Sequence, residues 1–469
     1  MSIHTISRRG LLGGAAAASA IGRVHAGQET DAFTTPGSGK RSGTAQPWFG
    51  KAGLGLMICW GPCSLAGVEI GWGMFRDVGG ANGVWPVEKY NALFDRFNPS
   101  NYDPDPWLAA AAKAGFKYTV FLTRHHDGYA LWPSQYGVYS TRTKMGGRDL
   151  IKPFVEATRR HGLKVGFYYS PGDWNFAPAG WPHHGFPLRD PEFKYRRPER
   201  TMGIPRYSDM PIPEMQRYFD QLYAHVKGQI GELLTRYGKI DLLWLDGYDW
   251  PIGIDHHPAD LETHIRKLQP GIVLNDRNMI WDKGRHSGDF STEWENRNPP
   301  RRPEGAWEQC EAVCGGWSWK GENAACKSAA YLISRLVRNR AWGGNYLPSF
   351  GPRPDGTMSA AYYAICEQMA AWMKAGAPSV FNAGAGPYPE HVDVPATIRG
   401  RVLYLHFLAG ESRKAMLTGL GKPVSARLLR TLAPVPFKVD GNRVAVELPA
   451  GADPAIDEVV EVTLPAERR

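Results

Sequence analysis

Asp246 is the residue in this chain best placed to do chemistry. The mostly apolar run Ile240 to Leu245 ends in Asp246-Gly247, and Trp244 lies two residues before the aspartate. Residues two apart on a strand point to the same face, so the carboxylate and the indole should share one pocket. A carboxylate can attack the anomeric carbon of a sugar, and an indole can line the apolar side of its ring. Taken alone, the aspartate could equally be a helix N-cap or a turn residue.

His125 and His126 form a second candidate group. They lie just after the run Tyr118 to Leu122, beyond Thr123 and Arg124, and are followed by Asp127-Gly128. An imidazole both donates and accepts hydrogen bonds, which suits recognition of sugar hydroxyls. A metal pair or structural hydrogen bonds are the alternatives. Two adjacent histidines without a third close ligand are only a weak indication of a metal site.

Hydrolysis of a glycoside needs a second carboxyl group, which protonates the leaving oxygen. The candidates are Glu293 and Glu295, in an acid-rich segment that begins at Gly288, and Glu308 further on. Each of these acids could instead be a solvated surface residue.

Five short apolar runs in the sequence end in polar or aromatic clusters, and these runs must position the candidates. They are Leu54 to Ile58, Tyr118 to Leu122, Val165 to Phe167, Ile240 to Leu245 and Ile272 to Leu274. Buried parallel strands read as apolar runs, and barrel enzymes hold their chemistry at the carboxyl ends of such strands. We therefore predict one site assembled from five strand ends.

Helical patterns alternate with these runs, which favours a (β/α)8-like barrel. We expect helices at 107–114, 149–161, 214–236, 258–268, 326–340 and 359–375. The catalytic barrel is predicted to span 46–375, with long loops at 175–213 and 279–308. Short strands and the turn Asp440-Gly441 then predict a small antiparallel β-sandwich over 376–469.

Composition narrows the class of protein. Of the 469 residues, 43% are hydrophobic and 22% charged, which is typical of a soluble globular protein. The net charge is +9, yet no Lys/Arg block is typical of nucleic-acid binding, so a nucleic-acid partner is not expected. The 17 tryptophans suit stacking on sugars, although large cores also use them.

The N-terminus resembles an export signal. Residues 1–26 contain a twin-arginine-like pair, Arg8 and Arg9, an Ala-rich stretch and a small-residue cleavage pattern at Ala26. Residues 27–45 are predicted to be a flexible lead. We expect no membrane span and a location in the bacterial periplasm or outside the cell. The six cysteines are expected to be buried thiols, with disulfides possible and metal ligation not expected.

Taken together, these motifs resemble those of the α-L-fucosidase family of retaining glycoside hydrolases. The resemblance covers nearly the whole chain and follows the family order. The matching segments are Ile58-Cys59-Trp60-Gly61-Pro62, Arg124-His125-His126-Asp127-Gly128, Arg148-Asp149-Leu150, Phe167-Tyr168-Tyr169-Ser170, Tyr237-Gly238-Lys239-Ile240-Asp241, Trp244-Leu245-Asp246-Gly247, Asn275-Asp276-Arg277, Gly288-Asp289-Phe290 and Gly343-Gly344-Asn345.

The resemblance implies roles for individual residues. Asp246 matches the family nucleophile. The acid/base of the family follows a threonine as Thr-x-Glu. Here Thr292 is followed directly by Glu293, then by Trp294 and Glu295, so the spacing differs from the family pattern by one residue for either glutamate. Glu293 is the first choice, with Glu295 and Glu308 behind it. The implied sugar-binding residues are Cys59, Trp60, Glu69, Trp72, His125, His126, Tyr168, Trp244 and Arg277.

Two departures from the family pattern concern substrate identity. Cys59 stands where the family has a histidine before Trp-Gly. A thiol is a weak donor, and a lost hydrogen bond to a buried hydroxyl costs about 1–3 kcal/mol. The segment after Gly344-Asn345 also differs from the apolar run that is usual in the family.

The sequence predicts an exported exo-glycosidase that acts on α-L-fucosides or related L-sugar glycosides. Asp246 would form a glycosyl-enzyme, and an acid/base carboxyl would lie roughly 5–5.5 Å from it, as retention requires. No metal or organic cofactor is expected, the partner is a glycan substrate, and the oligomeric state stays open. The alternative is a fucose-binding homologue with impaired catalysis. A glycan-binding role for the sandwich itself has no sequence support beyond its fold.

Overall fold

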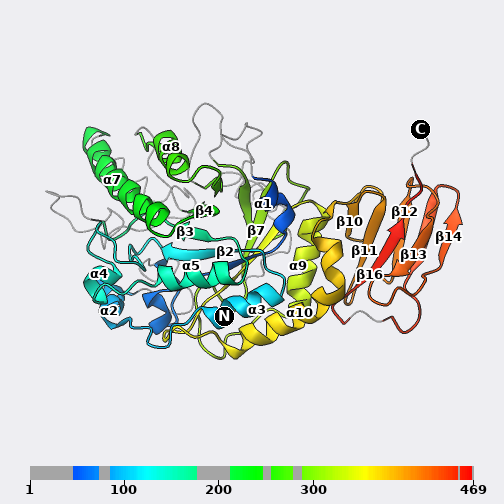
Figure 1. The fold of residues 1–469 in the computed structure, drawn as a ribbon, viewed down its shortest axis with the longest axis horizontal. Coiled ribbons are helices and arrows are strands. Elements are labelled where there is room, and N and C mark those ends of the chain that lie inside the picture. Colours follow the sequence, from blue (N-terminus) through cyan, green and yellow to red (C-terminus); the bar gives the residue numbers. More distant parts are fainter. Residues whose placement is uncertain are drawn as a thin grey trace, which may run out of the picture.

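The computed structural model describes residues 46–72, 85–176, 212–246, 255–277, 288–452 and 455–466, without the side chains of residues 87, 212, 215 and 293. Figure 1 shows an α/β body at one end and a smaller body of β-strands at the other. The predicted export signal and flexible lead lie outside the described residues, as does most of the predicted loop at 175–213.

Eight strands form one sheet, in the order β5-β4-β3-β2-β1-β8-β7-β6. Every neighbouring pair is parallel. A parallel bridge between Asn275 and Phe290 links β5 to β6 and closes the barrel. The strands are β1 (Gly55–Ile58), β2 (Tyr118–Arg124), β3 (Gly166–Tyr169), β4 (Leu242–Leu245), β5 (Val273–Leu274), β6 (Ser291–Glu295), β7 (Trp307–Ala312) and β8 (Asn345–Phe350).

Helices surround this barrel, and their sequences show why they begin where they do. The Ser328 and Ser359 hydroxyls accept hydrogen bonds from backbone N–H groups in the first turns of α9 and α10. The long helix α7 buries Leu222, Val226 and Ile230, which lie on one face. The helices are α1 (Pro47–Ala52), η1 (Pro62–Leu65), α2 (Val87–Arg96), α3 (Asp105–Lys113), α4 (Thr141–Lys144), α5 (Ile151–Arg160), α7 (Ile212–Arg236), α8 (Pro258–Leu268), α9 (Ala329–Ala341) and α10 (Ala360–Val380).

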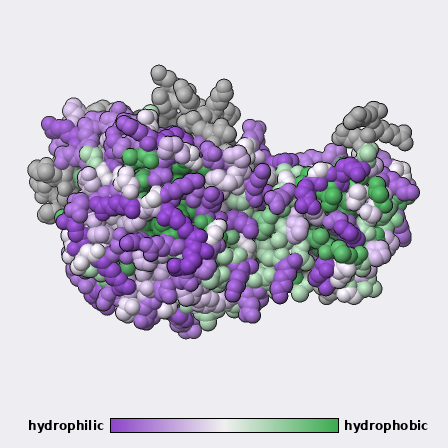
Figure 2. Space-filling view, in the orientation of Figure 1, coloured by the Kyte–Doolittle hydropathy of each residue, from purple (hydrophilic) through white to green (hydrophobic). Residues whose placement is uncertain are grey.

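The C-terminal part consists of two antiparallel sheets that enclose their own core. The orders are β13-β16-β11-β10-β9 and β12-β15-β14. In Figure 2 the visible face of this part carries a higher share of apolar side chains than the barrel does. The strands are β9 (Gly384–Ala385), β10 (Ala396–Arg399), β11 (Val402–Leu408), β12 (Lys414–Thr418), β13 (Ser425–Leu428), β14 (Phe437–Asp440), β15 (Arg443–Glu447) and β16 (Asp457–Thr463).

The predicted barrel and sandwich are confirmed, and the five apolar runs form β1 to β5. The interpretation of 279–308 as one long loop is wrong, because it contains β6 and the start of β7. The sequence of β6 is Ser-Thr-Glu-Trp-Glu, so the strand lacks the apolar pattern of its neighbours. The expected domain boundary at residue 376 falls inside α10, which ends at Val380.

One disulfide joins Cys314 to Cys326, and the other four cysteines are buried free thiols. Within the described part of the chain, no helix is both long and apolar enough to cross a bilayer.

Candidate active site

Asp246 follows β4 directly and so lies at the carboxyl end of the parallel barrel strands. Two neighbours hold the two carboxylate oxygens. The Tyr168 hydroxyl donates to Oδ2 at 2.7 Å, and the Arg277 guanidinium donates to Oδ1 at 3.1 Å. The Asp246 side chain is still 23% exposed. The carboxylate is therefore held in place but remains accessible to a substrate.

The residue before Asp246 is fixed by a side chain rather than by strand pairing alone. The Asn275 side chain accepts from the Leu245 backbone N–H at 2.8 Å and donates to the Leu245 carbonyl at 2.9 Å. Asn275 is fully buried. Both backbone groups of the last β4 residue are thus satisfied, which fixes the direction in which Asp246 leaves the strand.

Arg277 connects Asp246 to a second carboxylate. Its guanidinium also binds Glu295 Oε2 at 3.0 Å and the Thr292 carbonyl at 2.7 Å. Burial disfavours the charged guanidinium, but the charges of Glu295 and Asp246 outweigh this and raise the pKa of Arg277. Two carboxylates, at the ends of β4 and β6, therefore share one permanently charged side chain.

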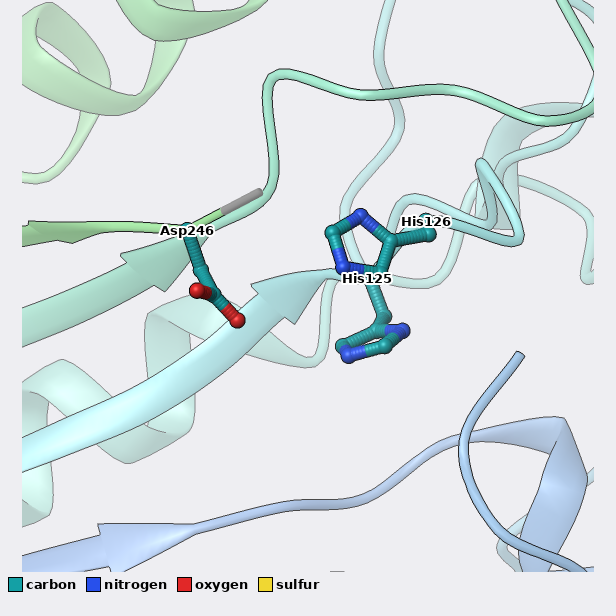
Figure 3. A group of neighbouring side chains, drawn as sticks. All are labelled: His125, His126 and Asp246. Atoms are coloured by element: carbon teal, nitrogen blue, oxygen red, sulfur yellow. The ribbon is translucent and has the colours of Figure 1, made fainter. Parts of the chain in front are cut away.

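The two histidines face Asp246 from the segment that follows β2, as Figure 3 shows. One ring nitrogen from each of His125 and His126 and one carboxylate oxygen of Asp246 all lie within 4.8 Å of one another. Burial lowers the pKa of His125 well below its usual value and that of His126 to about 4. Both imidazoles are therefore neutral near pH 7, and each ring has one donor and one acceptor nitrogen, of which His126 Nδ1 already contacts the Ser170 hydroxyl.

The same three residues could also hold a metal ion, but their other contacts favour a substrate. The Arg277 guanidinium already neutralises Asp246, and it would repel a divalent cation bound at that carboxylate. The His126 Nδ1 is in hydrogen-bond contact with the Ser170 hydroxyl. These contacts favour a substrate over a metal ion beside the three side chains.

Aromatic rings line the site beside these polar groups. Tyr168 stacks on Trp244 with a centroid separation of 5.5 Å, and His125 stacks with Tyr168 at 5.7 Å. Trp72 and Trp174 pack edge to face at 5.0 Å, and both contact His126. Such flat apolar surfaces next to hydroxyl-binding groups are suited to a sugar ring.

Gly71 allows the segment that carries Trp72 to approach the histidines. Its φ is +63°, and a Cβ there would lie 3.1 Å from His125 Nδ1 and 3.0 Å from the Trp174 ring. The Gly71 N–H donates to the Tyr90 hydroxyl at 2.8 Å, and that hydroxyl donates to Asp127 at 2.8 Å. Only glycine combines this backbone conformation with this close contact.

Glu69 and Cys59 occupy the side of the site that faces η1 and the disulfide-closed segment 314–326. Glu69 accepts from the Trp317 backbone N–H at 3.1 Å and pairs with Lys320 at 3.1 Å. Burial raises the pKa of the Cys59 thiol, and the charges of Glu69, Asp246 and Glu295 raise it further. These effects show that Cys59 lies close to the carboxylates of the site.

Two predicted site residues lie elsewhere. Trp60 is fully buried, stacks on Tyr102 at 5.0 Å and donates to the Arg353 carbonyl, so it is a core residue rather than a pocket residue. Glu308 is also fully buried, and its oxygens accept from Trp244 and Tyr118. A carboxylate with no exposed surface cannot meet a leaving oxygen, so the structure does not support Glu308 as the acid/base.

Glu293 and Glu295 are the other two acid candidates. The Glu293 side chain lies outside the described part of the chain. Glu295 is 40% exposed and shares Arg277 with Asp246. Among the side chains that the structure describes, Glu295 is the candidate connected to Asp246.

Sequence reasoning missed three residues that build the site. Ser170 donates to the Asp246 carbonyl at 3.1 Å, Asn275 fixes Leu245, and Trp174 lines the pocket. Ser170 and Asn275 stand at the ends of recognised motifs, so the signal was their position directly after a buried strand. Trp174 lies in the segment after β3, where nothing but its residue type indicated a role.

Comparisons with known proteins agree on one family. The model of a family described as alpha-L-fucosidase matches residues 21–377. Tissue alpha-L-fucosidase of Bos taurus is 25% identical over 353 residues, covering 71% of this chain and 68% of that protein. Alpha-L-fucosidase isoenzyme 1 from Paenibacillus thiaminolyticus is 30% identical in structural alignment, with a TM-score of 0.73 and coverage of 89% of this chain and 98% of that one.

A third similar structure is an alpha-L-fucosidase from Bacteroides thetaiotaomicron with a trapped covalent intermediate. It is in complex with 2-fluoro-fucosyl fluoride and carries a glutamate-to-glutamine mutation. It is 23% identical, has a TM-score of 0.72, and covers 93% of this chain and 99% of that one. At this identity it supports the fold.

Proposed function

This chain belongs to the α-L-fucosidase family of glycoside hydrolases, and from that premise we propose that it is a retaining exo-glycosidase for α-L-fucosides or closely related L-sugar glycosides. The observation that carries the proposal is the bridge through Arg277, which binds one carboxylate at the end of β4 and another at the end of β6. A pair of neighbouring carboxyl groups is the machinery of glycoside hydrolysis.

In the first step, an Asp246 oxygen forms a bond to the anomeric carbon while the bond from that carbon to the leaving oxygen breaks. Glu295, in its protonated form, gives its proton to the leaving oxygen and becomes the carboxylate that Arg277 binds. In the second step, Glu295 takes a proton from water, whose oxygen attacks the anomeric carbon and displaces Asp246. Tyr168 and Arg277 orient the nucleophile.

Retention at the anomeric carbon tests this mechanism directly. We expect ¹H NMR of 4-nitrophenyl α-L-fucoside hydrolysis to show α-L-fucose as the first product, with the β anomer growing in later by mutarotation. Two displacements at one carbon restore its configuration. Free α-L-fucose in the same buffer gives the mutarotation rate for comparison. β-L-fucose as the first product would exclude a glycosyl-enzyme on Asp246.

Cys59 provides a test of substrate range. A thiol is smaller than the imidazole of the family pattern, which leaves room for the extra hydroxyl that distinguishes L-galactose from L-fucose. We expect Cys59→His to lower the ratio of kcat/KM for 4-nitrophenyl α-L-galactoside to that for the fucoside by roughly tenfold, the usual effect of one small group in a pocket.

Cys366→Ser is the matched control, because Cys366 is a buried thiol on α10. An unchanged ratio in Cys59→His would show that Cys59 does not set this preference.

We also propose export to the periplasm or the cell exterior. The support is the twin-arginine-like pair Arg8-Arg9, the Ala-rich stretch that follows and the small-residue pattern ending at Ala26.

A further inference from the structure

Glu308 is a buried charged group to which the proposed mechanism gives no task. It lies on β7 inside the barrel and is fully buried. Burial raises its pKa to about 7, although the hydrogen bonds from Tyr118 and Trp244 act in the opposite direction. Placing a carboxyl group in such a site costs free energy unless its oxygens are well bonded. Its hydrogen bonds indicate what it does there.

Both Glu308 oxygens bind side chains from other barrel strands. Oε1 accepts from the Trp244 indole N–H at 3.0 Å, and Oε2 accepts from the Tyr118 hydroxyl. The indole has a single N–H, so an acceptor at a fixed position determines how the ring is turned about its side-chain bonds. Trp244 is only 2% exposed, and the alternative to this bond is an unpaired buried donor.

The Trp244 ring in turn supports both partners of the Asp246 carboxylate. Tyr168 stacks on it with only 18° between the ring planes, and the Arg277 Cζ lies 4.7 Å from its centroid. Tyr168 binds Asp246 Oδ2, and Arg277 binds Asp246 Oδ1. A rotated indole would therefore move the two groups that aim the nucleophile.

We propose that Glu308 is a positioning residue, which acts through Trp244 to hold Tyr168 and Arg277 against Asp246, and that it takes no part in proton transfer. This inference rests on the proposed function, because it assigns a role within that reaction. It also explains why an acid lies inside the barrel and binds Trp244, one of the aromatic rings that line the site.

Two substitutions separate this role from acid/base catalysis. Glu308→Gln keeps an acceptor oxygen for the indole at nearly the same volume, so we expect kcat/KM for 4-nitrophenyl α-L-fucoside to stay within about threefold of wild type. Glu308→Leu removes both acceptors and should lower kcat/KM by roughly 10- to 100-fold. The loss should be mostly in kcat, because a misplaced Tyr168 and Arg277 no longer hold Asp246 in line with the anomeric carbon in the transition state. The loss should be equal for aryl and sugar leaving groups.

The double variant with Trp244→Phe tests whether the effect passes through the indole. Phenylalanine has no N–H, so Glu308→Leu should cost little more in that background. Tyr118→Phe keeps the Trp244 bond and should have a smaller effect than Glu308→Leu. Glu311→Leu is the matched control, because Glu311 is a buried acid on the same strand that binds Lys327, Arg335 and Tyr346 instead.

The results can contradict the proposal in two ways. A Glu308→Gln enzyme as impaired as Glu308→Leu on sugar leaving groups, and rescued by azide, would make Glu308 the acid/base. A Glu308→Leu enzyme with lowered melting temperature but wild-type kcat/KM per folded molecule would make it a core residue only.

A readout independent of turnover keeps this proposal separate from the proposed function. In ¹⁵N-tryptophan-labelled protein, the Trp244 indole N–H resonance, assigned with Trp244→Phe, should move upfield in Glu308→Leu and stay near its wild-type position in Glu308→Gln. An unmoved resonance in Glu308→Leu would overturn the positioning role. Wild-type protein that hydrolyses no α-L-fucoside would instead overturn the proposed function, whatever the resonance does.

Discussion

Replacing Asp246 by asparagine is expected to lower kcat/KM for 4-nitrophenyl α-L-fucoside by at least about 10,000-fold, as the loss of a catalytic nucleophile does in other enzymes. An amide cannot form the glycosyl ester, so the effect falls on the chemical step. The fold should survive, because Arg277 keeps its bonds to Glu295 and Thr292 when the Asp246 charge is removed. Initial rates and far-UV circular dichroism measure the two expectations.

Asp440→Asn is the matched control for this change. Asp440 is an exposed acid at the end of β14, in the C-terminal sheets, and its variant should keep wild-type activity. An Asp246→Asn enzyme that is folded and retains more than about a hundredth of wild-type kcat/KM would remove Asp246 from the nucleophile role.

Replacing Glu295 by glutamine should have an effect that depends on the leaving group. For a fucosylated sugar, whose leaving oxygen needs a proton, we expect kcat/KM to fall about 1,000-fold, within the usual range for general acid catalysis. For 4-nitrophenyl α-L-fucoside the bond-breaking step needs little protonation, so kcat/KM should fall far less. Azide should accelerate the aryl reaction, since it replaces water without needing a general base.

Glu293→Gln is the control on the same strand, with the same change of chemistry two residues away. The leaving-group dependence should be absent from it. If Glu293→Gln shows the dependence and azide rescue while Glu295→Gln does not, the acid/base is Glu293, the first choice from sequence, and the pairing of Glu295 with Arg277 is structural.

The sequence predicted the barrel because its first five strands are short apolar runs with polar ends. It failed at β6, where buried Thr292 carries polar atoms that bind Arg277 and Asp276. A strand built from residues that hold the site lacks the apolar pattern by which strands are recognised. The polar residues that β6 needs to hold the site therefore hid the strand from recognition in the sequence.

Some contacts of the candidate site could likewise be predicted from the sequence, and others could not. Asp246, Tyr168 and Arg277 could be predicted to meet, because parallel strands bring their carboxyl ends to one rim. Trp60 could not be excluded from sequence, since only packing against Tyr102 and Phe97 shows that its ring turns into the core. Glu308 differs from Glu295 in its burial, which depends on the closed barrel and is not visible in the sequence.

Asn275 has a consequence for how this scaffold can change. Because its amide binds both the N–H and the carbonyl of Leu245, the barrel wall fixes the backbone from which the nucleophile projects. The orientation of Asp246 is therefore inherited with the pairing of β4 and β5, and any redesign of this scaffold has to keep Asn275 in order to keep the reaction.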